Sequence, residues 1–197
     1  MKRTLITLAS LFMACTAAAA HDDAALKHRT LLGFVEWVTL EPSGLHLKAR
    51  LDTGAKTSSL HGLEPEEFER DGEDWVRFKL PLEHRKDDAP QLVLERPVER
   101  VVLVKRKGAP PQRRYVVQLP LCLDGTSYQA EFSLTDRSGF IYPVLLGREF
   151  LREVAVVDPA ESFIASRACE HKSLEELAQA LAESDGGKLH SEQESTE

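Results

Sequence analysis

One stretch of the sequence joins a strand pattern to a carboxylate in a tight turn. Residues 45–51 alternate apolar side chains with polar or basic ones, and this two-residue period is typical of a half-buried strand. Asp52, Thr53 and Gly54 follow directly, and a glycine lets the backbone turn sharply. The chain is therefore expected to build a sheet that presents Asp52 just beyond a strand end.

Short strands separated by turn residues are expected along most of the chain. Asp124-Gly125 between two apolar runs predicts a tight hairpin. Strands are expected at 32–40, 45–51, 57–63, 75–80, 98–104, 114–123, 126–134, 142–146 and 154–157, a turn or short helix at 65–70, a long charged connection at 81–97, and helices at 148–153 and 174–182. This pattern predicts an all-β fold, a small closed β-barrel with one short helix after Gly147 and a C-terminal helix.

A second stretch, far downstream, carries a different motif that accompanies the first in one known family. Tyr142–Leu151 is an apolar run that passes through Gly147 and Arg148 into a helical turn. In this order the two stretches resemble the retropepsin-like aspartic peptidases, in which Asp-Thr-Gly-Ala carries the catalytic aspartate and Gly-Arg opens the helix behind it. The longer match is similar to a bacterial branch usually labelled ATP-dependent zinc proteases and associated with RimK-type glutamate ligases. It comprises Lys48–His61, Ser133–Ser138 and Leu146–Arg148, within a resemblance that runs from Leu31 to Phe163.

The resemblance implies that Asp52 is catalytic and that the chain acts as a homodimer. Aspartic peptidases use two carboxylates that share one proton, because like charges so close cannot both ionise. The sequence holds one Asp-Thr-Gly, and the residues after Asp71, Asp124 and Asp136 stand in the wrong order for a second. Asp52 is therefore expected to meet its counterpart from a second chain on a two-fold axis.

The same resemblance implies supporting roles for the residues next to the catalytic aspartate. Thr53 is implied to hydrogen-bond across the dimer axis, and Gly54 to allow the close approach. Ala55 completes the loop, and Gly147 and Arg148 are implied to open the helix packed behind it.

The chain departs from the retroviral pattern at Lys56. Retroviral enzymes carry there an aspartate that pairs with the arginine and also turns toward the substrate backbone. Arg148 is therefore expected to find another partner, with Asp136 and Asp158 as candidates. Two plainer interpretations stay open, in which Asp52 only bonds its own turn and Arg148 is a surface arginine at a helix start.

No cofactor is expected, although the branch label mentions zinc and ATP. The histidines at 46, 61, 84 and 171 are scattered and form no His-Glu-x-x-His motif. The sequence has neither a Gly-x-x-x-x-Gly-Lys-Ser/Thr phosphate loop nor a Gly-x-Ser-x-Gly nucleophile elbow. A net charge of −7 argues against nucleic acid as a partner. The short basic runs at 105–107 and 113–114 are either solvated or a contact surface for an acidic peptide.

Residues 1–20 have the order of a secretory signal peptide. Lys2 and Arg3 precede a short apolar stretch and three alanines, and this stretch is too short to cross a bilayer unaided. A periplasmic protein without a stable membrane span is expected, and lipid attachment at Cys15 is the alternative. The predicted order is a signal peptide at 1–20, a disordered N-terminus at 21–30, the retropepsin-like barrel at 31–168, a C-terminal helix at 169–185 and a disordered tail at 186–197.

Cys122 and Cys169 are the cysteines that remain after this cleavage. An oxidising compartment permits a disulfide between them, and two buried thiols are an equal alternative.

The sequence thus predicts a periplasmic aspartic endopeptidase that works as a homodimer on a peptide or protein substrate. The alternative is a non-catalytic peptide-binding module on the same fold, serving an envelope peptide-modifying system associated with a glutamate ligase. A third interpretation, a structural envelope lipoprotein, rests on Cys15 alone.

The signal peptide is directly testable. Intact-mass analysis of the periplasmic fraction is expected to find a protein that begins at His21, because signal peptidase cleaves after small residues such as Ala20. A full-length cytosolic product would contradict this expectation, and a lipidated Cys15 would support the alternative.

Overall fold

The computed structural model describes residues 29–106 and 108–193. The expected signal peptide at 1–20, the polar segment up to residue 28 and the last four residues, 194–197, lie outside the described residues. Thr30 already belongs to the first strand, so that strand begins at the end of the segment expected to be disordered.

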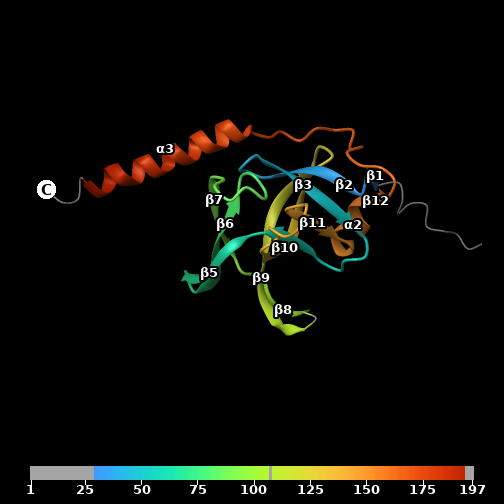
Figure 1. The fold of residues 1–197 in the computed structure, drawn as a ribbon, viewed down its shortest axis with the longest axis horizontal. Coiled ribbons are helices and arrows are strands. Elements are labelled where there is room, and N and C mark those ends of the chain that lie inside the picture. Colours follow the sequence, from blue (N-terminus) through green and yellow to red (C-terminus); the bar gives the residue numbers. More distant parts are fainter. Residues whose placement is uncertain (1–28, 107, 194–197) are drawn as a thin grey trace, which may run out of the picture.

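Six strands of one sheet close into a ring, which is seen in the middle of Figure 1. The order is β10-β4-β11-β3-β2-β9, and β9 pairs back with β10. The seventh strand, β8, lies beyond β9. The members of this sheet are β2 (Val35–Leu40), β3 (Leu45–Asp52), β4 (Ser58–His61), β8 (Arg100–Arg106), β9 (Ala109–Leu123), β10 (Thr126–Thr135) and β11 (Val144–Gly147).

The remaining elements lie outside this sheet. Strands β1 (Thr30–Gly33) and β12 (Ala155–Asp158) pair in parallel, and β5 (Leu63–Arg70), β6 (Glu73–Pro81) and β7 (Gln91–Pro97) form a separate antiparallel sheet. The helices among the described residues are α2 (Arg148–Val154) and α3 (Leu174–Gln193). The predicted all-β class is confirmed, as are the short helix after Gly147 and a helix near the C-terminus.

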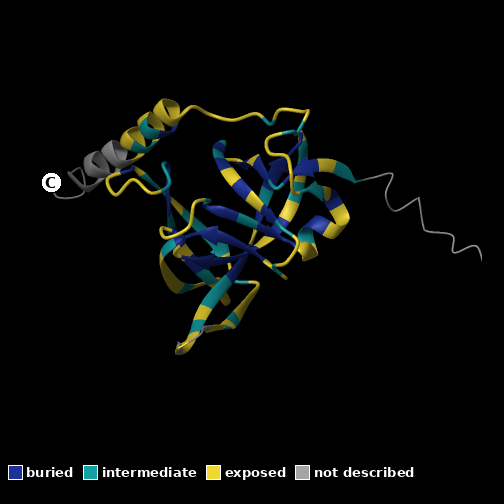
Figure 2. Cartoon of the chain, turned by 45° about the vertical axis from the view of Figure 1, so that its right-hand side comes forward, coloured by how far each residue is buried: buried dark blue, intermediate teal, exposed yellow. Residues whose placement is uncertain are grey.

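Alternating strand residues fill the inside of the ring. The apolar residues of β3 are at most 4% exposed, and the polar residues between them are half-buried or exposed. This explains the period of two in the sequence, since successive strand side chains point to opposite faces. Figure 2 shows the buried residues gathered in the ring and the exposed ones along the loops and α3.

The inserted sheet is the three-stranded sheet at residues 63–97. It corrects two predictions. Residues 65–70 were expected as a turn or short helix but belong to β5, and the long connection expected at 81–97 contains β7. Pairing with β6 overrides the weak strand propensity of the acidic sequence in β5. Pro65 is tolerated because β5 is an edge strand.

The segment 159–173, called the C-terminal strap, is fastened to the ring by buried polar groups. Glu36 is fully buried and accepts hydrogen bonds from the backbone N–H groups of Gly33, Ile164 and Ala165 at 2.7, 3.0 and 3.3 Å. A buried carboxylate needs such donors, because leaving it unpaired is costly. The strap therefore lies where it can supply them.

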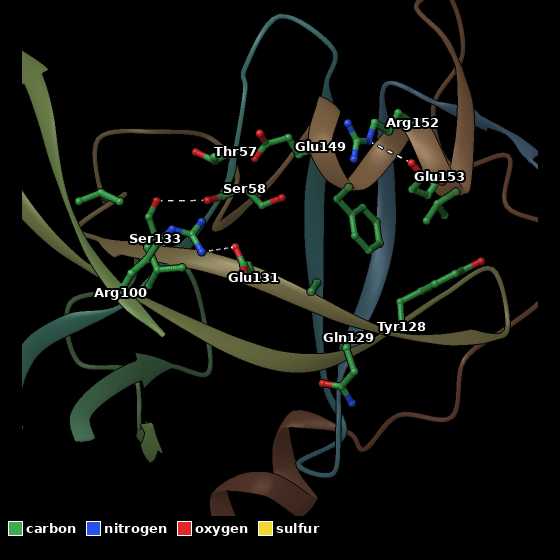
Figure 3. Close-up of a pocket in the computed structure, with 15 residues that line it drawn as sticks. Thr57, Ser58, Arg100, Tyr128, Gln129, Glu131, Ser133, Glu149, Arg152 and Glu153 are labelled. Atoms are coloured by element: carbon green, nitrogen blue, oxygen red, sulfur yellow. Dashed lines mark hydrogen bonds and ion pairs between the residues drawn. The ribbon is translucent and has the colours of Figure 1, made fainter. Parts of the chain in front are cut away.

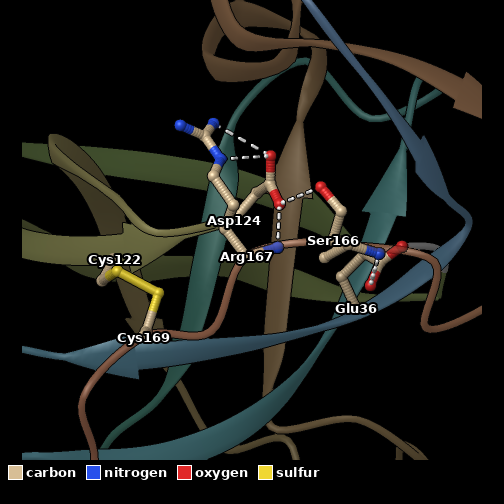
Figure 4. Close-up of polar contacts among 7 residues, drawn as sticks. Glu36, Cys122, Asp124, Ser166, Arg167 and Cys169 are labelled. Atoms are coloured by element: carbon tan, nitrogen blue, oxygen red, sulfur yellow. Dashed lines mark hydrogen bonds and ion pairs between the residues drawn. A yellow bond between two sulfur atoms is a disulfide. The ribbon is translucent and has the colours of Figure 1, made fainter.

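A second fastening point lies at the β9–β10 turn (Figure 4). Asp124, 4% exposed, accepts the N–H of Arg167 at 2.8 Å and pairs with its guanidinium at 3.0 Å. The pKa of Asp124 lies below its ordinary value because hydrogen bonds and the charge from Arg167 outweigh the effect of burial, which by itself raises it. Cys122 and Cys169 form a disulfide beside it, which resolves the alternative left open by the sequence.

The C-terminal helix differs from its predicted bounds. Helical spacing was expected at 174–182, within a segment at 169–185. The helix begins at Leu174, as that spacing predicts, but it continues through Gln193, into the segment expected to be a disordered tail. Ser173 and Glu176 explain the start, since each side chain accepts the backbone N–H of the other, at 3.2 and 2.7 Å. This is a capping box. In the described part of the chain, neither helix combines the length and apolar character needed to cross a bilayer.

Replacing Glu36 with alanine is expected to destabilise the fold by about 2–4 kcal/mol, because it leaves buried backbone donors without an acceptor. Urea unfolding followed by circular dichroism measures this change. Glu69, an exposed glutamate on β5, gives the matched control Glu69→Ala, with an expected change within about 0.5 kcal/mol. Equal effects of the two substitutions would show that Glu36 does not hold the strap.

Candidate active site

Asp52 is the last residue of β3 and lies beside the end of β11. The two strands are parallel, and their register pairs Leu51 with Leu146 and Asp52 with Gly147. Two motifs far apart in the sequence thereby become neighbours. The loop 53–57 and the helix α2 leave these strands side by side.

One carboxylate oxygen of Asp52 shapes its own loop. Oδ1 accepts the N–H groups of Gly54 and Ala55 at 3.0 and 3.2 Å, as the plainer interpretation of a turn aspartate expected. The other oxygen, Oδ2, lies 3.8 Å from Nε of Arg50, and the side chain of Asp52 is 31% exposed. The carboxylate therefore fixes the turn with one oxygen, and its side chain stays partly accessible to solvent.

Thr53 and Gly54 form the exposed tip of this loop. A Cβ atom on Gly54 would lie 3.2 Å from Oδ1 of Asp52, which is a tight contact. The glycine therefore suits a turn folded back on the carboxylate, and the exposed tip leaves its Thr53 side chain open to contact from outside.

Backbone carbonyl groups of the loop cap the start of α2. The N–H groups of Arg148 and Glu149 donate to the carbonyl oxygens of Ala55 and Lys56 at 2.9 and 3.1 Å. These amides have no partner inside the helix, so the loop satisfies them. The helix thereby holds the loop that follows Asp52 in place.

The partner of Arg148 differs from both predicted candidates. Its Nη1 donates to the carbonyl oxygen of Gly54 at 3.1 Å. Asp136 and Asp158 instead accept the N–H groups of the residues two positions further on, at 2.8 Å each. A backbone carbonyl thus replaces the expected carboxylate, and sequence motifs give no signal for such a partner.

Lys56, the residue that departs from the retroviral pattern, lies 3.6 Å from Glu149. Both side chains are largely exposed, so the pair contributes little stability. The pair joins the loop to α2 with the base on the loop and the acid on the helix, which is the reverse of the retroviral arrangement.

Gly147 sits where no side chain fits. A Cβ atom there would lie 2.5 Å from the backbone carbon and 2.6 Å from the oxygen of Thr57. The N–H of Gly147 also donates to Oγ of buried Ser58 at 3.1 Å. The end of β11 and the start of β4 therefore approach each other backbone to backbone.

A groove lies beside α2 (Figure 3), and Asp52 is not among the residues that line it. The groove has a volume of about 430 Å³ and lies between α2, β8 and β10. Tyr128 and Phe150 meet there edge to face, with ring centroids 5.7 Å apart. Thr57 and Ser58 line one side, so the groove touches the chain that follows the Asp52 loop. No sequence pattern indicated this groove.

The histidines considered as metal ligands do not gather at Asp52. His46 stacks between the rings of Trp37 and His171, and its pKa is lowered to about 4 by burial and by the charge of His171. His61 and His84 meet at the end of β4. Among residues 29–106 and 108–193, no three His, Cys, Asp or Glu side chains come together as a metal site. The absence of a cofactor stays a prediction.

Comparisons with known proteins show the family to which most of the chain is similar. Residues 31–168 match the family model RimB-like, described as "Retropepsin-like aspartic endopeptidase RimB". Two curated relatives, from Desulfotalea psychrophila and Shewanella pealeana, are each named "Probable alpha-L-glutamate ligase". Each is 35% identical, over 134 and 140 residues, which are 67% and 69% of this chain.

The match to these relatives is partial on their side. It covers 28% and 30% of their lengths, so the chain resembles less than a third of each. A crystal structure of a Legionella pneumophila protein of unknown function (DUF785) is 32% identical and superposes with a TM-score of 0.60. That match covers 70% of this chain and 98% of the other.

The substitution Gly147→Ala is expected to destabilise the protein by about 2–4 kcal/mol and to displace the Asp52 loop, because the new methyl group overlaps the backbone of Thr57. Thermal unfolding and amide NMR shifts of residues 52–57 measure the two effects. Gly139 has open space around its Cβ position, so Gly139→Ala is the matched control. Unchanged loop shifts in Gly147→Ala would contradict the proposed backbone contact.

Proposed function

The chain belongs to the RimB-like family of retropepsin-like aspartic endopeptidases, and we propose that it hydrolyses peptide bonds with a pair of Asp52 side chains, one from each chain of a homodimer. The observation that carries the proposal is the accessible carboxylate of Asp52 at a strand end, in a loop braced by α2. The exposed tip formed by Thr53 and Gly54 supports contact with a second chain.

The proposed reaction needs both carboxylates and one proton between them. The ionised Asp52 takes a proton from water while the water oxygen attacks the peptide carbonyl carbon, and the protonated Asp52 gives its proton to the carbonyl oxygen. In the next step, the Asp52 that took the proton from water gives it to the amide nitrogen. The other Asp52 recovers a proton from a hydroxyl group of the tetrahedral intermediate as the C–N bond breaks. The pair ends with the one proton with which it began.

We further propose that the enzyme works in the periplasm. The signal-like order of residues 1–20 supports export. The Cys122–Cys169 disulfide supports it independently, because such bonds persist in oxidising compartments and are rare in the cytosol.

An acidic peptide is the proposed substrate class. The hairpin of β8 and the first half of β9 carries basic residues and no Asp or Glu between residues 100 and 123, in a chain of net charge −7. The basic residues on these strands are Arg100, Lys105, Arg106, Arg113 and Arg114. Opposite charge of this kind steers and orients a charged ligand. The glutamate-ligase names of the relatives favour glutamate-rich peptides within this class.

The second candidate is a binding module on the same fold that serves a glutamate-ligase system without cleaving peptides. Lys56 favours it, because the residue stands where retroviral enzymes place a carboxylate facing the substrate. The same basic hairpin would bind the acidic peptide in that case.

Asp52→Asn is expected to abolish cleavage without unfolding the protein. The amide keeps the size of the side chain but cannot accept the proton of water, and loss of a general base costs about 10²–10⁴ in rate, or about 3–5 kcal/mol of barrier. The measurement is cleavage of a glutamate-rich peptide library at about pH 4–7, with circular dichroism and sedimentation on each protein. Asp158 bonds a turn amide after a strand in a similar way, so Asp158→Asn is the matched control.

Three outcomes would separate the candidates. Equal cleavage by wild type and Asp52→Asn would exclude Asp52 as the catalyst. Peptide binding by a folded wild type that cleaves nothing would favour the binding module. A wild type that cleaves only as a monomer would contradict the shared pair of carboxylates.

A further inference from the structure

Three separate segments meet at the end of β4. They are His61 itself, the loop 82–90 that joins β6 to β7 in the inserted sheet, and the loop 136–143 that leads into β11. His61 and His84 touch edge to face here, with ring centroids 5.0 Å apart. The meeting point therefore connects the inserted sheet to the strand that pairs with the Asp52 strand.

His61 holds the loop 136–143 through a nitrogen lone pair. The side chain is 4% exposed, and its Nδ1 accepts the backbone N–H of Arg137 at 2.8 Å. The backbone N–H of His61 donates to the carbonyl oxygen of Pro143 at 2.8 Å. Because Nδ1 is an acceptor, the first of these bonds requires a ring without a proton on that atom.

Arg137 is held in the same place with no carboxylate partner within ion-pair distance among the described residues. It is 5% exposed, and its guanidinium donates to Oγ of Ser59 and to the carbonyl oxygen of Tyr142 at 2.8 and 3.1 Å. It also lies 4.7 Å from the ring centre of Phe140. A buried positive charge therefore stands beside the two histidines.

His84 fixes the other side of the contact. Its Nε2 lies 2.8 Å from the carbonyl oxygen of Phe140, so Nε2 carries the hydrogen. Its Nδ1 is buried and has no hydrogen-bond partner among the described residues. Protonation of Nδ1 would therefore place a new N–H donor and a positive charge where nothing accepts them.

The surrounding charges oppose protonation of both rings. Burial lowers the pKa of His61 and of His84, and the guanidinium of Arg137 lowers both further. His84 also lowers the pKa of His61, and Arg85 lowers that of His84, while the carboxylate of Asp136 raises the pKa of both rings. The hydrogen bond to the Phe140 carbonyl likewise raises the pKa of His84 without reversing the net effect.

We propose that His61 and His84 form an acid-sensitive latch between the inserted sheet and the loop 136–143. Closed, the latch keeps both rings neutral, with Arg137 N–H bonded to His61 and the Phe140 carbonyl bonded to His84. When the latch is open, both rings are in contact with water and can take up protons. Acid therefore favours the open form.

The direction with pH follows from proton uptake. The closed form binds protons more weakly than free imidazole does. The equilibrium therefore favours the closed form fully above the ordinary histidine pKa of about 6.5, and it shifts toward the open form as the pH falls below that value. Each titrating ring shifts the opening equilibrium by up to about tenfold per pH unit.

Opening releases the loop 136–143, which leads into β11. Phe140 and Ile141 are 57% and 69% exposed and lie on the loop that the latch holds. The inserted sheet loses one of its ties to that loop at the same time. The inference concerns regulation of the region around the proposed active site, but it does not depend on Asp52 being catalytic.

Amide hydrogen exchange by NMR on the mature chain between about pH 5.5 and 7.5 tests the latch. After correction for intrinsic exchange, the amides of Arg137 and Phe140 are expected to lose about tenfold or more of their protection at the acidic end. The amide of Leu51, bonded to the Phe34 carbonyl in the ring, is the internal reference and is expected to keep its protection.

The double variant His61→Asn, His84→Gln is expected to remove this pH dependence. Asparagine retains an acceptor and glutamine a donor, but neither side chain titrates in this range. His171→Gln, at an exposed histidine, is the matched control and is expected to behave as wild type. If the double variant does not fold, the ring signals of His61 and His84 in wild type serve instead. They are expected to titrate together with the loss of Arg137 protection.

Either of two results would overturn the proposal. One is equal protection of Arg137 and Phe140 across the range in wild type. The other is an unchanged pH dependence in the folded double variant, or, where ring signals are used, titration of both rings without any change at the Arg137 amide.

Discussion

The contact between the backbone of Gly147 and the backbone of Thr57 is the constraint on which the site depends. It is too close for any Cβ atom, and it occurs where the parallel pairing of β3 with β11 sets Gly147 opposite Asp52. The loop after Asp52 can then cap the first amides of α2 with its carbonyl groups. Two motifs separated by almost half of the chain thus become one rigid unit, with the carboxylate at its open side.

Buried polar side chains that bind backbone amides fix the segments around this unit. Glu36 and Asp124 hold the C-terminal strap, and His61 holds the loop before β11. Each provides an acceptor for a backbone donor that strand pairing leaves free, as buried donors require. The exposed ion pairs, such as Lys56–Glu149, add little by comparison. Order in the loops therefore follows from a few buried acceptors.

The sequence was sufficient for the features that repeat or that belong to a motif. The period of residues 45–51, the Asp124-Gly125 hairpin and the Gly147-Arg148 helix start all have local signals, and the structure confirms each of them. The strand β5 was not predictable in this way, because its acidic sequence is held by pairing with β6. The partner of Arg148 is a carbonyl oxygen that every residue possesses. The His61–His84 contact depends on loops whose paths only the folded chain reveals.

In the proposed peptidase, each active site needs two Asp52 side chains. The most direct test mixes wild type and Asp52→Asn chains in varied proportions, allows the subunits to exchange, and measures cleavage of a glutamate-rich peptide. If the pair is shared across the dimer, activity falls with the square of the wild-type fraction, because mixed dimers hold one carboxylate and cannot share a proton between two. A linear fall would contradict a shared pair, since it would mean that each chain cleaves with its own Asp52 alone.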